Sequence, residues 1–94
     1  MNSIHSTAIV SSNAQIGKNV IIGPYCIVNS GVIIGNDCKL IANVYMDGNT
    51  TIGDNCIFYP FSSIGTNPQD LKYKGEKSSL IVGNNNTFRE HVTI

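Results

Sequence analysis

Apolar residues recur every six positions along nearly the whole of this 94-residue chain. An isolated amphipathic helix would repeat about every 3.6 residues and a half-buried strand about every 2. A step of six is instead typical of a parallel β-helix, in which each six-residue unit forms one short strand and one corner. The positions in this phase are Ile4, Val10, Ile16, Ile22, Val28, Ile34, Leu40, Met46, Ile52, Phe58, Ile64, Val82, Phe88 and Ile94.

Three six-residue units complete one triangular coil of eighteen residues, and successive coils stack at the strand spacing of about 4.8 Å. The sequence therefore predicts an all-β solenoid of about four coils, in which inward side chains eighteen residues apart form three columns. The predicted columns are Ile4, Ile22, Leu40 and Phe58; Val10, Val28, Met46 and Ile64; and Ile16, Ile34 and Ile52, continued by Val82.

Other positions of the repeat agree with this fold, and agreement at several levels is stronger evidence than one apolar column. Glycine often follows the apolar residue, as at positions 17, 23, 35, 53, 65 and 83. Residue types that tolerate a left-handed backbone are predicted at the corners: Asn13, Asn19, Gly31, Asp37, Asn43, Asn49, Asn55 and Asn85. A second, smaller inward position is predicted at Ala8, Ala14, Val20, Cys26, Val32, Cys38, Val44, Thr50, Cys56 and Ser62.

Composition limits the classes of function. Formal net charge is zero, which gives no electrostatic reason to expect a nucleic-acid or anionic-membrane partner. The N-terminus lacks the basic region and apolar stretch of a signal peptide, and no apolar run approaches the roughly 20 residues of a membrane span. We therefore expect a soluble, intracellular protein with one small domain over residues 1–94.

The three cysteines share the small inward position of the repeat. Cys38 and Cys56 are eighteen residues apart, so their separation on neighbouring coils would permit a disulfide. We expect all three to be reduced core residues. No Cys-x-x-Cys or His-x-x-x-His spacing occurs, so no metal site is predicted.

The repeat is interrupted once. Eighteen residues separate Ile64 from Val82 where one unit needs six, and the added segment, residues 66–79, is rich in charged residues. It also contains Pro68 and Gly75, which are typical of loops. Insertions at one corner of a solenoid often form a binding surface, although a plain solvated loop is the alternative.

Several motifs together resemble one family. The hexapeptides IGPYCI (22–27) and IGDNCI (52–57) resemble those of the hexapeptide-repeat acyltransferases, which form left-handed β-helices. The start IHSTAIV (4–10) and the stretch SSIGTNPQDLKYKGEKSSLIVGNNNTFREHVTI (62–94) are similar to one group of them, the acyl-ACP–UDP-N-acetylglucosamine O-acyltransferases, which begin lipid A synthesis. This resemblance implies a left-handed β-helix, a homotrimer and a bacterial cytoplasmic location. It also implies acyl carrier protein, with its phosphopantetheine arm, and a UDP-sugar as partners, with no metal or redox cofactor.

The resemblance assigns substrate-binding roles to Gln69, Asp70 and Lys72 within the motif QDLKY (69–73). A carboxylate accepts hydrogen bonds from sugar hydroxyls, whereas an ammonium group and an amide donate them. Asp70 and Lys72 could instead pair with each other, and an exposed pair contributes only about 0–1 kcal/mol.

The family uses a histidine as general base, and neither histidine of this chain, His5 or His91, matches it. We therefore expect no catalytic residue among residues 1–94. The chain is interpreted as the N-terminal part of a longer acyltransferase that lacks the later coils and the helical domain, or as a truncated product.

Three alternatives remain at the level of sequence. One is a different hexapeptide-repeat transferase, such as the lipid A N-acyltransferase or a sugar acetyltransferase, against which the QDLKY insert argues. Another is a non-catalytic ice-binding or scaffolding solenoid, although no Thr-x-Thr ladder recurs. The third is an inert β-helix fragment.

Overall fold

The computed structural model describes residues 2–65, 79–90 and 94. Every regular element in this part of the chain is a strand. The strands are β1 (Ser3–Ile4), β2 (Ile9–Val10), β3 (Gln15–Ile16), β4 (Ile21–Ile22), β5 (Ile27–Val28), β6 (Ile33–Ile34), β7 (Lys39–Leu40), β8 (Tyr45–Met46), β9 (Asn49–Ile52), β10 (Ile57–Phe58), β11 (Ser63–Ile64), β12 (Ser79–Val82) and β13 (Thr87–Phe88).

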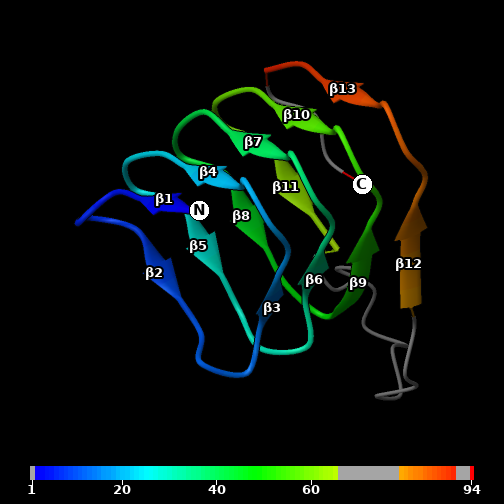
Figure 1. Ribbon diagram of the computed structural model, residues 1–94, viewed down its shortest axis with the longest axis horizontal. Helices are drawn as coiled ribbons and strands as arrows, with labels where there is room; N and C mark the ends of the chain where they lie inside the picture. The colour runs from blue at the N-terminus through cyan, green and yellow to red at the C-terminus, as the bar shows by residue number, and fades with distance from the viewer. Residues whose placement is uncertain (1, 66–78, 91–93) are drawn as a thin grey trace, which may run out of the picture.

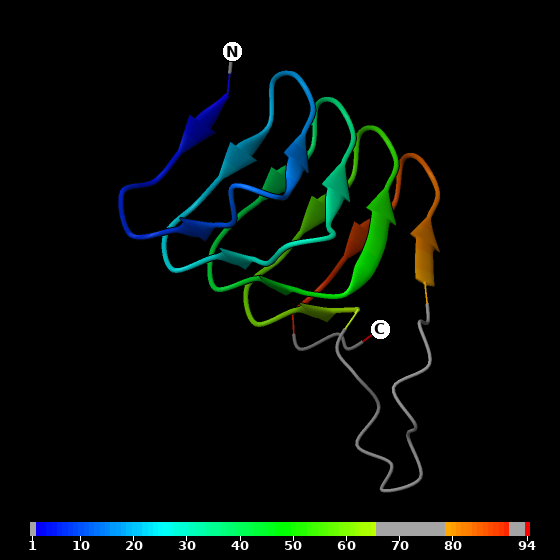
Figure 2. The ribbon, with the colours of Figure 1, turned by 90° about the horizontal axis from the view of Figure 1, so that it is seen from below.

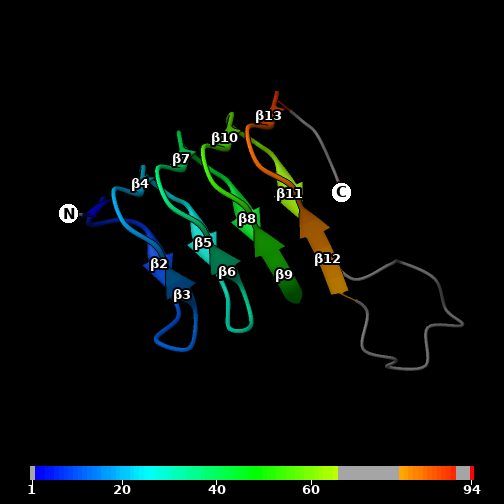
Figure 3. The same cartoon turned by 45° about the vertical axis from the view of Figure 1, so that its right-hand side comes forward.

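The strands form three parallel sheets, each built from every third strand. Sheet A has the order β1-β4-β7-β10-β13, sheet B the order β2-β5-β8-β11 and sheet C the order β3-β6-β9-β12. The coils therefore stack side by side from the N-terminal end onward (Figures 1 and 3). Across the residues described, no helix is long and apolar enough to cross a membrane.

The three predicted columns are confirmed by the strand register. Ile22 pairs with Leu40 in sheet A, Val28 with Met46 in sheet B and Ile34 with Ile52 in sheet C. The central members of each column are buried, whereas Ile4 remains 47% exposed. Ile4 is exposed because it stacks on one neighbour only, Ile22.

The second inward position is also confirmed, since every member from Val20 to Ser62 is buried. Its two hydroxyl groups are hydrogen-bonded, as buried polar groups must be. Thr50 Oγ1 donates to Asp47 O at 2.8 Å and Ser62 Oγ donates to Tyr59 O at 2.7 Å. The cysteines Cys26, Cys38 and Cys56 are free and buried, as expected.

The prediction of left-handed backbone at the corners is correct at most of the positions named. The backbone is left-handed at Asn19, Gly31, Asp37, Asn43, Asn55 and Asn85. It was wrong for Asn49, because β9 begins there and Gly48 takes the positive φ of 73° instead. It was also wrong for Asn13, which lies in a turn where its N–H donates to Ser11 Oγ at 3.1 Å.

The repeat glycine at the corner from sheet C to sheet A is explained by close approach between coils. A β-carbon at Gly17 or Gly35 would come within 2.6 Å or 2.5 Å of the side-chain oxygen of Asn36 or Asp54. Each of these side-chain oxygens accepts a hydrogen bond from a backbone N–H of the preceding coil. Lys18 N donates to Asn36 Oδ1 and Asn36 N donates to Asp54 Oδ1, both at 2.8 Å. Glycine and this side-chain ladder therefore depend on one another.

Candidate functional site

The interruption of the repeat occurs between sheet B and sheet C in the fourth coil. Ile64 pairs with Met46 in β8, and Val82 pairs with Ile52 in β9, so the register is the same on both sides. Figure 2 shows β12 beside β9 where the chain rejoins the coil. The extra residues therefore leave the stacking of the coils unchanged.

The boundary of the insert needs a correction of one residue. Ser79 was predicted to be the last residue of the insert, but it is the first residue of β12 and pairs with Asn49. The strands β9 and β12 pair over four residues, Ser79–Val82 against Asn49–Ile52, whereas the other paired strands have two. This longer pairing extends the strand back to Ser79.

The residue before the insert is Gly65, which no other residue could replace without strain. Gly65 has a positive φ of 73°, and a β-carbon there would overlap Thr50 Oγ1 and Asp47 O of the preceding coil. Its N–H donates to Ile94 O at 2.7 Å. The backbone immediately before the insert is thus packed directly against the corner formed by Asp47 and Thr50.

That corner carries a hydrogen-bonded polar cluster of three side chains. Asn29 Nδ2 donates to the Tyr45 hydroxyl at 3.1 Å, and the Tyr45 hydroxyl donates to Asp47 Oδ2 at 3.2 Å. The other oxygen, Asp47 Oδ1, accepts from Gly48 N at 2.7 Å. The cluster fixes the Asp47–Gly48 turn on which Gly65 packs.

Partial burial of the phenol, together with the neighbouring Asp47 carboxylate, raises the pKa of Tyr45 above its ordinary value. Tyr45 therefore stays protonated near neutral pH and keeps donating to Asp47. The sequence analysis did not single out this cluster. The available signal was that Asn29 and Asp47 are eighteen residues apart, with Tyr45 two residues before Asp47 on the outer face of β8.

The predicted substrate-binding residues Gln69, Asp70 and Lys72 lie outside the described residues, so their roles remain predictions. His91 also lies outside them. His5 is exposed in the first coil, where Thr7 N donates to its Nδ1 at 3.1 Å. His5 thus belongs to a local turn three coils away from the insert.

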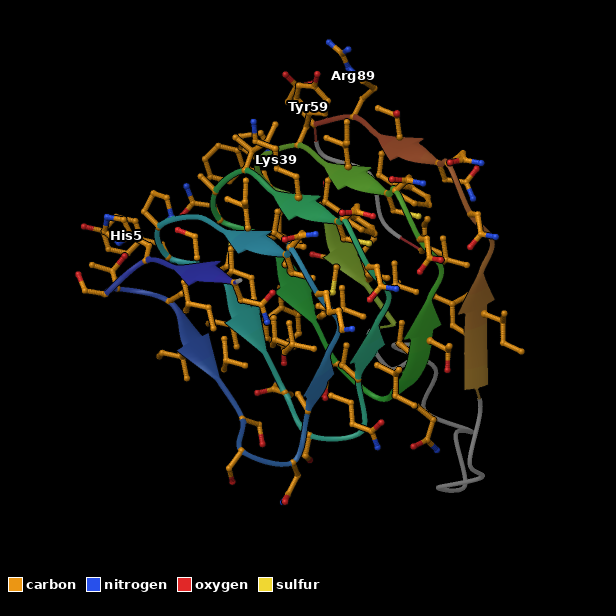
Figure 4. The ribbon with its side chains drawn as sticks, viewed as in Figure 1. His5, Lys39, Tyr59 and Arg89 are labelled. Atoms are coloured by element: carbon orange, nitrogen blue, oxygen red, sulfur yellow. The ribbon has the colours of Figure 1, made fainter. Side chains whose placement is uncertain are left out.

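A second group of polar side chains lies where sheet A turns into sheet B. The Arg89 guanidinium lies 4.3 Å from the centre of the Tyr59 ring, and Arg89 Nε is 3.4 Å from Glu90 Oε1. Figure 4 shows Tyr59 and Arg89 together near β10 and β13, with His5 at the opposite end of sheet A. No group of three or more potential metal ligands occurs within residues 2–65, 79–90 and 94.

Comparison with known families agrees with the repeat. A model of the bacterial transferase hexapeptide, described as six repeats, matches residues 13–46 and 31–66. The chain belongs to the bacterial transferase hexapeptide family.

This hexapeptide-repeat chain has curated and solved relatives. An acyl-[acyl-carrier-protein]–UDP-N-acetylglucosamine O-acyltransferase of Thermodesulfovibrio yellowstonii is 55% identical over all of the chain and 36% of the relative. A solved structure of LpxA from Acinetobacter baumannii is 50% identical with a TM-score of 0.92, covering 96% of this chain and 35% of that one.

The UDP-N-acetylglucosamine acyltransferase LpxA from Bacteroides fragilis is 41% identical with a TM-score of 0.92, covering 97% of this chain and 36% of that one. These similarities confirm the predicted resemblance and the left-handed parallel β-helix. The chain spans about a third of the length of these relatives.

Proposed function

We propose that this chain is the N-terminal part of an acyltransferase that moves a 3-hydroxyacyl group from acyl carrier protein to the 3-hydroxyl of UDP-N-acetylglucosamine, in lipid A synthesis. The observation that carries the proposal is 55% identity to such an enzyme over all 94 residues of the chain. The repeat alone would fit other hexapeptide transferases, but the insert and the identity favour this substrate pair.

The insert supplies the sugar-recognition groups in this proposal. Gln69 and Lys72 donate hydrogen bonds, and the Asp70 carboxylate accepts them from sugar hydroxyls. The unchanged register on both sides of the insert supports this role, because it holds the two ends of the insert at fixed places on a rigid solenoid. Binding residues often lie on segments that a rigid scaffold positions in this way.

The chemical step is acyl transfer. The sugar hydroxyl oxygen attacks the thioester carbonyl while a general base takes the hydroxyl proton. The carbon–sulfur bond then breaks, and the phosphopantetheine sulfur leaves as a thiol after it takes that proton back from the base. His5 is hydrogen-bonded within its own turn, three coils from the insert. We assign the base to a residue outside the 94 residues, so this chain by itself should not catalyse transfer.

The remaining properties follow from the same proposal. The acyl donor is acyl carrier protein, the acceptor is a UDP-sugar, and the working assembly is a homotrimer with active sites between subunits. The reaction needs no metal or redox cofactor, and we place it in the bacterial cytoplasm.

A chimera tests this proposal. Residues 1–94 would replace the matching N-terminal residues of the Thermodesulfovibrio yellowstonii relative, and acyl transfer from 3-hydroxyacyl-ACP to UDP-N-acetylglucosamine would be measured. We expect activity comparable with that of the relative. A second chimera lacking residues 67–78 restores the six-residue spacing from Ile64 to Val82, so it should fold but lose transfer.

Two results would contradict the proposal. A folded first chimera that is active only with a different acyl acceptor would show a different substrate class. A deletion chimera that retains full activity would show that the insert does not bind the sugar.

A further inference from the structure

The described residues on either side of the insert rest on one corner of the preceding coil. This corner, here the 47–50 corner, comprises the Asp47–Gly48 turn and the first half of β9. On the N-terminal side of the insert, a β-carbon at Gly65 would overlap Asp47 O, and a β-carbon at Gly48 would lie 2.9 Å from Gly65 O. The two glycines therefore let the backbones of the two coils approach closely at this place.

The chain on the C-terminal side of the insert pairs with the same corner. Ser79–Leu80 of β12 pair with Asn49–Thr50, in the half of each strand that extends beyond the two-residue length of the other paired strands. Within the corner, Thr50 Oγ1 donates to Asp47 O at 2.8 Å. The conformation of the 47–50 corner therefore sets the position of both ends of the insert.

Asp47 connects this corner to the polar cluster of Asn29, Tyr45 and Asp47. Both of its carboxylate oxygens are held, since Oδ1 accepts from Gly48 N at 2.7 Å and Oδ2 accepts from the Tyr45 hydroxyl at 3.2 Å. The Tyr45 hydroxyl in turn accepts from Asn29 Nδ2 at 3.1 Å. A chain of hydrogen bonds thus joins the second coil to the corner on which the insert rests.

The hexapeptide repeat does not require a phenol at position 45. The corresponding outer residues of the first two coils are Ile9 and Ile27, and the three positions pair in register. The corners that follow Ile9 and Ile27 form without a tyrosine, and neither carries an insert. The position of Tyr45 therefore coincides with the insert and not with the repeat.

We propose that Asn29, Tyr45 and Asp47 are positioning residues for the UDP-sugar: they hold the 47–50 corner in the conformation that presents the insert to its substrate. The inference rests on the sugar-binding role proposed above for the insert and adds the residues that act through it. None of the three needs to contact the substrate. Loss of the cluster should therefore weaken recognition of the sugar without changing that of acyl carrier protein.

The test uses the first chimera described above and measures KM for each substrate separately, well below the Tm. Tyr45→Phe removes only the hydroxyl group. We expect KM for UDP-N-acetylglucosamine to rise about 2- to 12-fold, the range for loss of one hydrogen bond, and KM for 3-hydroxyacyl-ACP to stay unchanged. Tyr25→Phe is the matched control, because it removes a phenol hydroxyl from an exposed side chain between sheets A and B. It should change neither KM.

Two substitutions of Asp47 give a second readout. Asp47→Asn keeps an oxygen that accepts from Gly48 N and places an amide donor beside the Tyr45 oxygen, so hydrogen bonding on both sides is retained. Asp47→Ala removes both contacts. KM for the UDP-sugar should rise with Asp47→Ala and stay close to that of the unsubstituted chimera with Asp47→Asn.

Hydrogen exchange gives a readout that does not depend on activity. In Tyr45→Phe, the backbone amides of residues 47–50 and 79–82 should exchange faster than in the unsubstituted chimera, because the corner opens more often. Tyr25→Phe should leave exchange in both segments unchanged. A cluster that served only the stability of the whole fold would lower the amount of active enzyme, and thus kcat, with both KM values unchanged.

The outcomes separate this inference from the proposed function. If the chimera lacking residues 67–78 loses transfer but Tyr45→Phe leaves KM for the UDP-sugar unchanged, the insert keeps its sugar-binding role and the positioning role is overturned. Equal rises in both KM values would also overturn the positioning role. If the chimera lacking residues 67–78 retains full activity, both proposals are overturned.

Discussion

Phe58 and Phe88 stack with their ring centroids 4.8 Å apart and their planes 10° from parallel. They are paired residues of β10 and β13 in sheet A, although thirty positions separate them in sequence instead of the usual eighteen. The stack shows that the twelve additional residues of the fourth coil do not shift the register. The sheet A column thus continues across the insert.

Truncating the two rings should have unequal effects. Phe58 is fully buried, so Phe58→Ala should lower the free energy of unfolding by about 3–5 kcal/mol through lost burial and a residual cavity. Phe88 is only partly buried, so Phe88→Ala should cost clearly less. Urea unfolding of both variants measures the difference, and equal losses would contradict the burial described here.

Two repeat glycines should respond differently to a methyl group. A β-carbon at Gly23 would overlap the backbone carbonyl of Ile41 in the next coil, so Gly23→Ala should destabilise the protein by about 1–3 kcal/mol. At Gly83 the nearest atom is 3.8 Å away, so Gly83→Ala should change stability by no more than about 0.5 kcal/mol. Thermal unfolding tests the pair, and a tolerated Gly23→Ala would mean that the coils can separate locally.

Tyr45 should make stability fall at alkaline pH. Burial and the Asp47 charge raise its pKa in the folded protein, so the folded state holds the phenolic proton more tightly than the unfolded chain. This stabilisation is complete below the unfolded pKa of about 10 and is lost as pH rises through the folded pKa. Between those values the wild type should lose more stability than Tyr45→Phe, which cannot titrate.

At neutral pH, Tyr45→Phe should cost about 0.5–1.5 kcal/mol, because the hydrogen bond to Asp47 is lost. Urea unfolding of both proteins at a series of pH values provides the measurement. Parallel stability curves for wild type and variant at alkaline pH would show that Tyr45 does not titrate differently on folding.

The cysteines should react slowly with thiol reagents in the folded protein. All three are buried, and burial raises the pKa of the Cys26 and Cys38 thiols, which lowers the reactive thiolate fraction at any given pH. Cys38 Sγ also donates to Gly53 O at 3.1 Å. Titration with a chromogenic disulfide should label three thiols only after denaturation, and rapid native labelling would contradict their inward position.

Asp70 should matter for the substrate and not for folding. In the chimera, Asp70→Ala should lower kcat/KM for the UDP-sugar by about 10- to 150-fold, the effect of losing a hydrogen bond of roughly 1.5–3 kcal/mol to a charged group. Glu76→Ala, which removes another carboxylate of the insert outside the QDLKY motif, is the control and should have little effect. A sharp fall in Tm with unchanged kcat/KM would make Asp70 structural.

The period of six by itself determined the sheets, the columns and the second inward position, from Val20 to Ser62, because each depends only on which residues must leave water. The interruption of that period located the insert, and the resemblance identified the family. Only the family resemblance supports the substrate-binding roles of Gln69, Asp70 and Lys72. Those roles depend on where the side chains lie, which a sequence period does not describe.

Contacts between coils decided what the sequence pattern could not. The left-handed corner moved from Asn49 to Gly48 because β9 pairs with β12 over four residues. The Asn29–Tyr45–Asp47 cluster and the Arg89–Tyr59 contact join residues of different coils. The positive φ of Tyr25 and Phe61, two corner residues that the pattern did not predict to be left-handed, also appeared only in the structure. Such features depend on side-chain orientation and distance between coils, and a repeat in one dimension specifies neither.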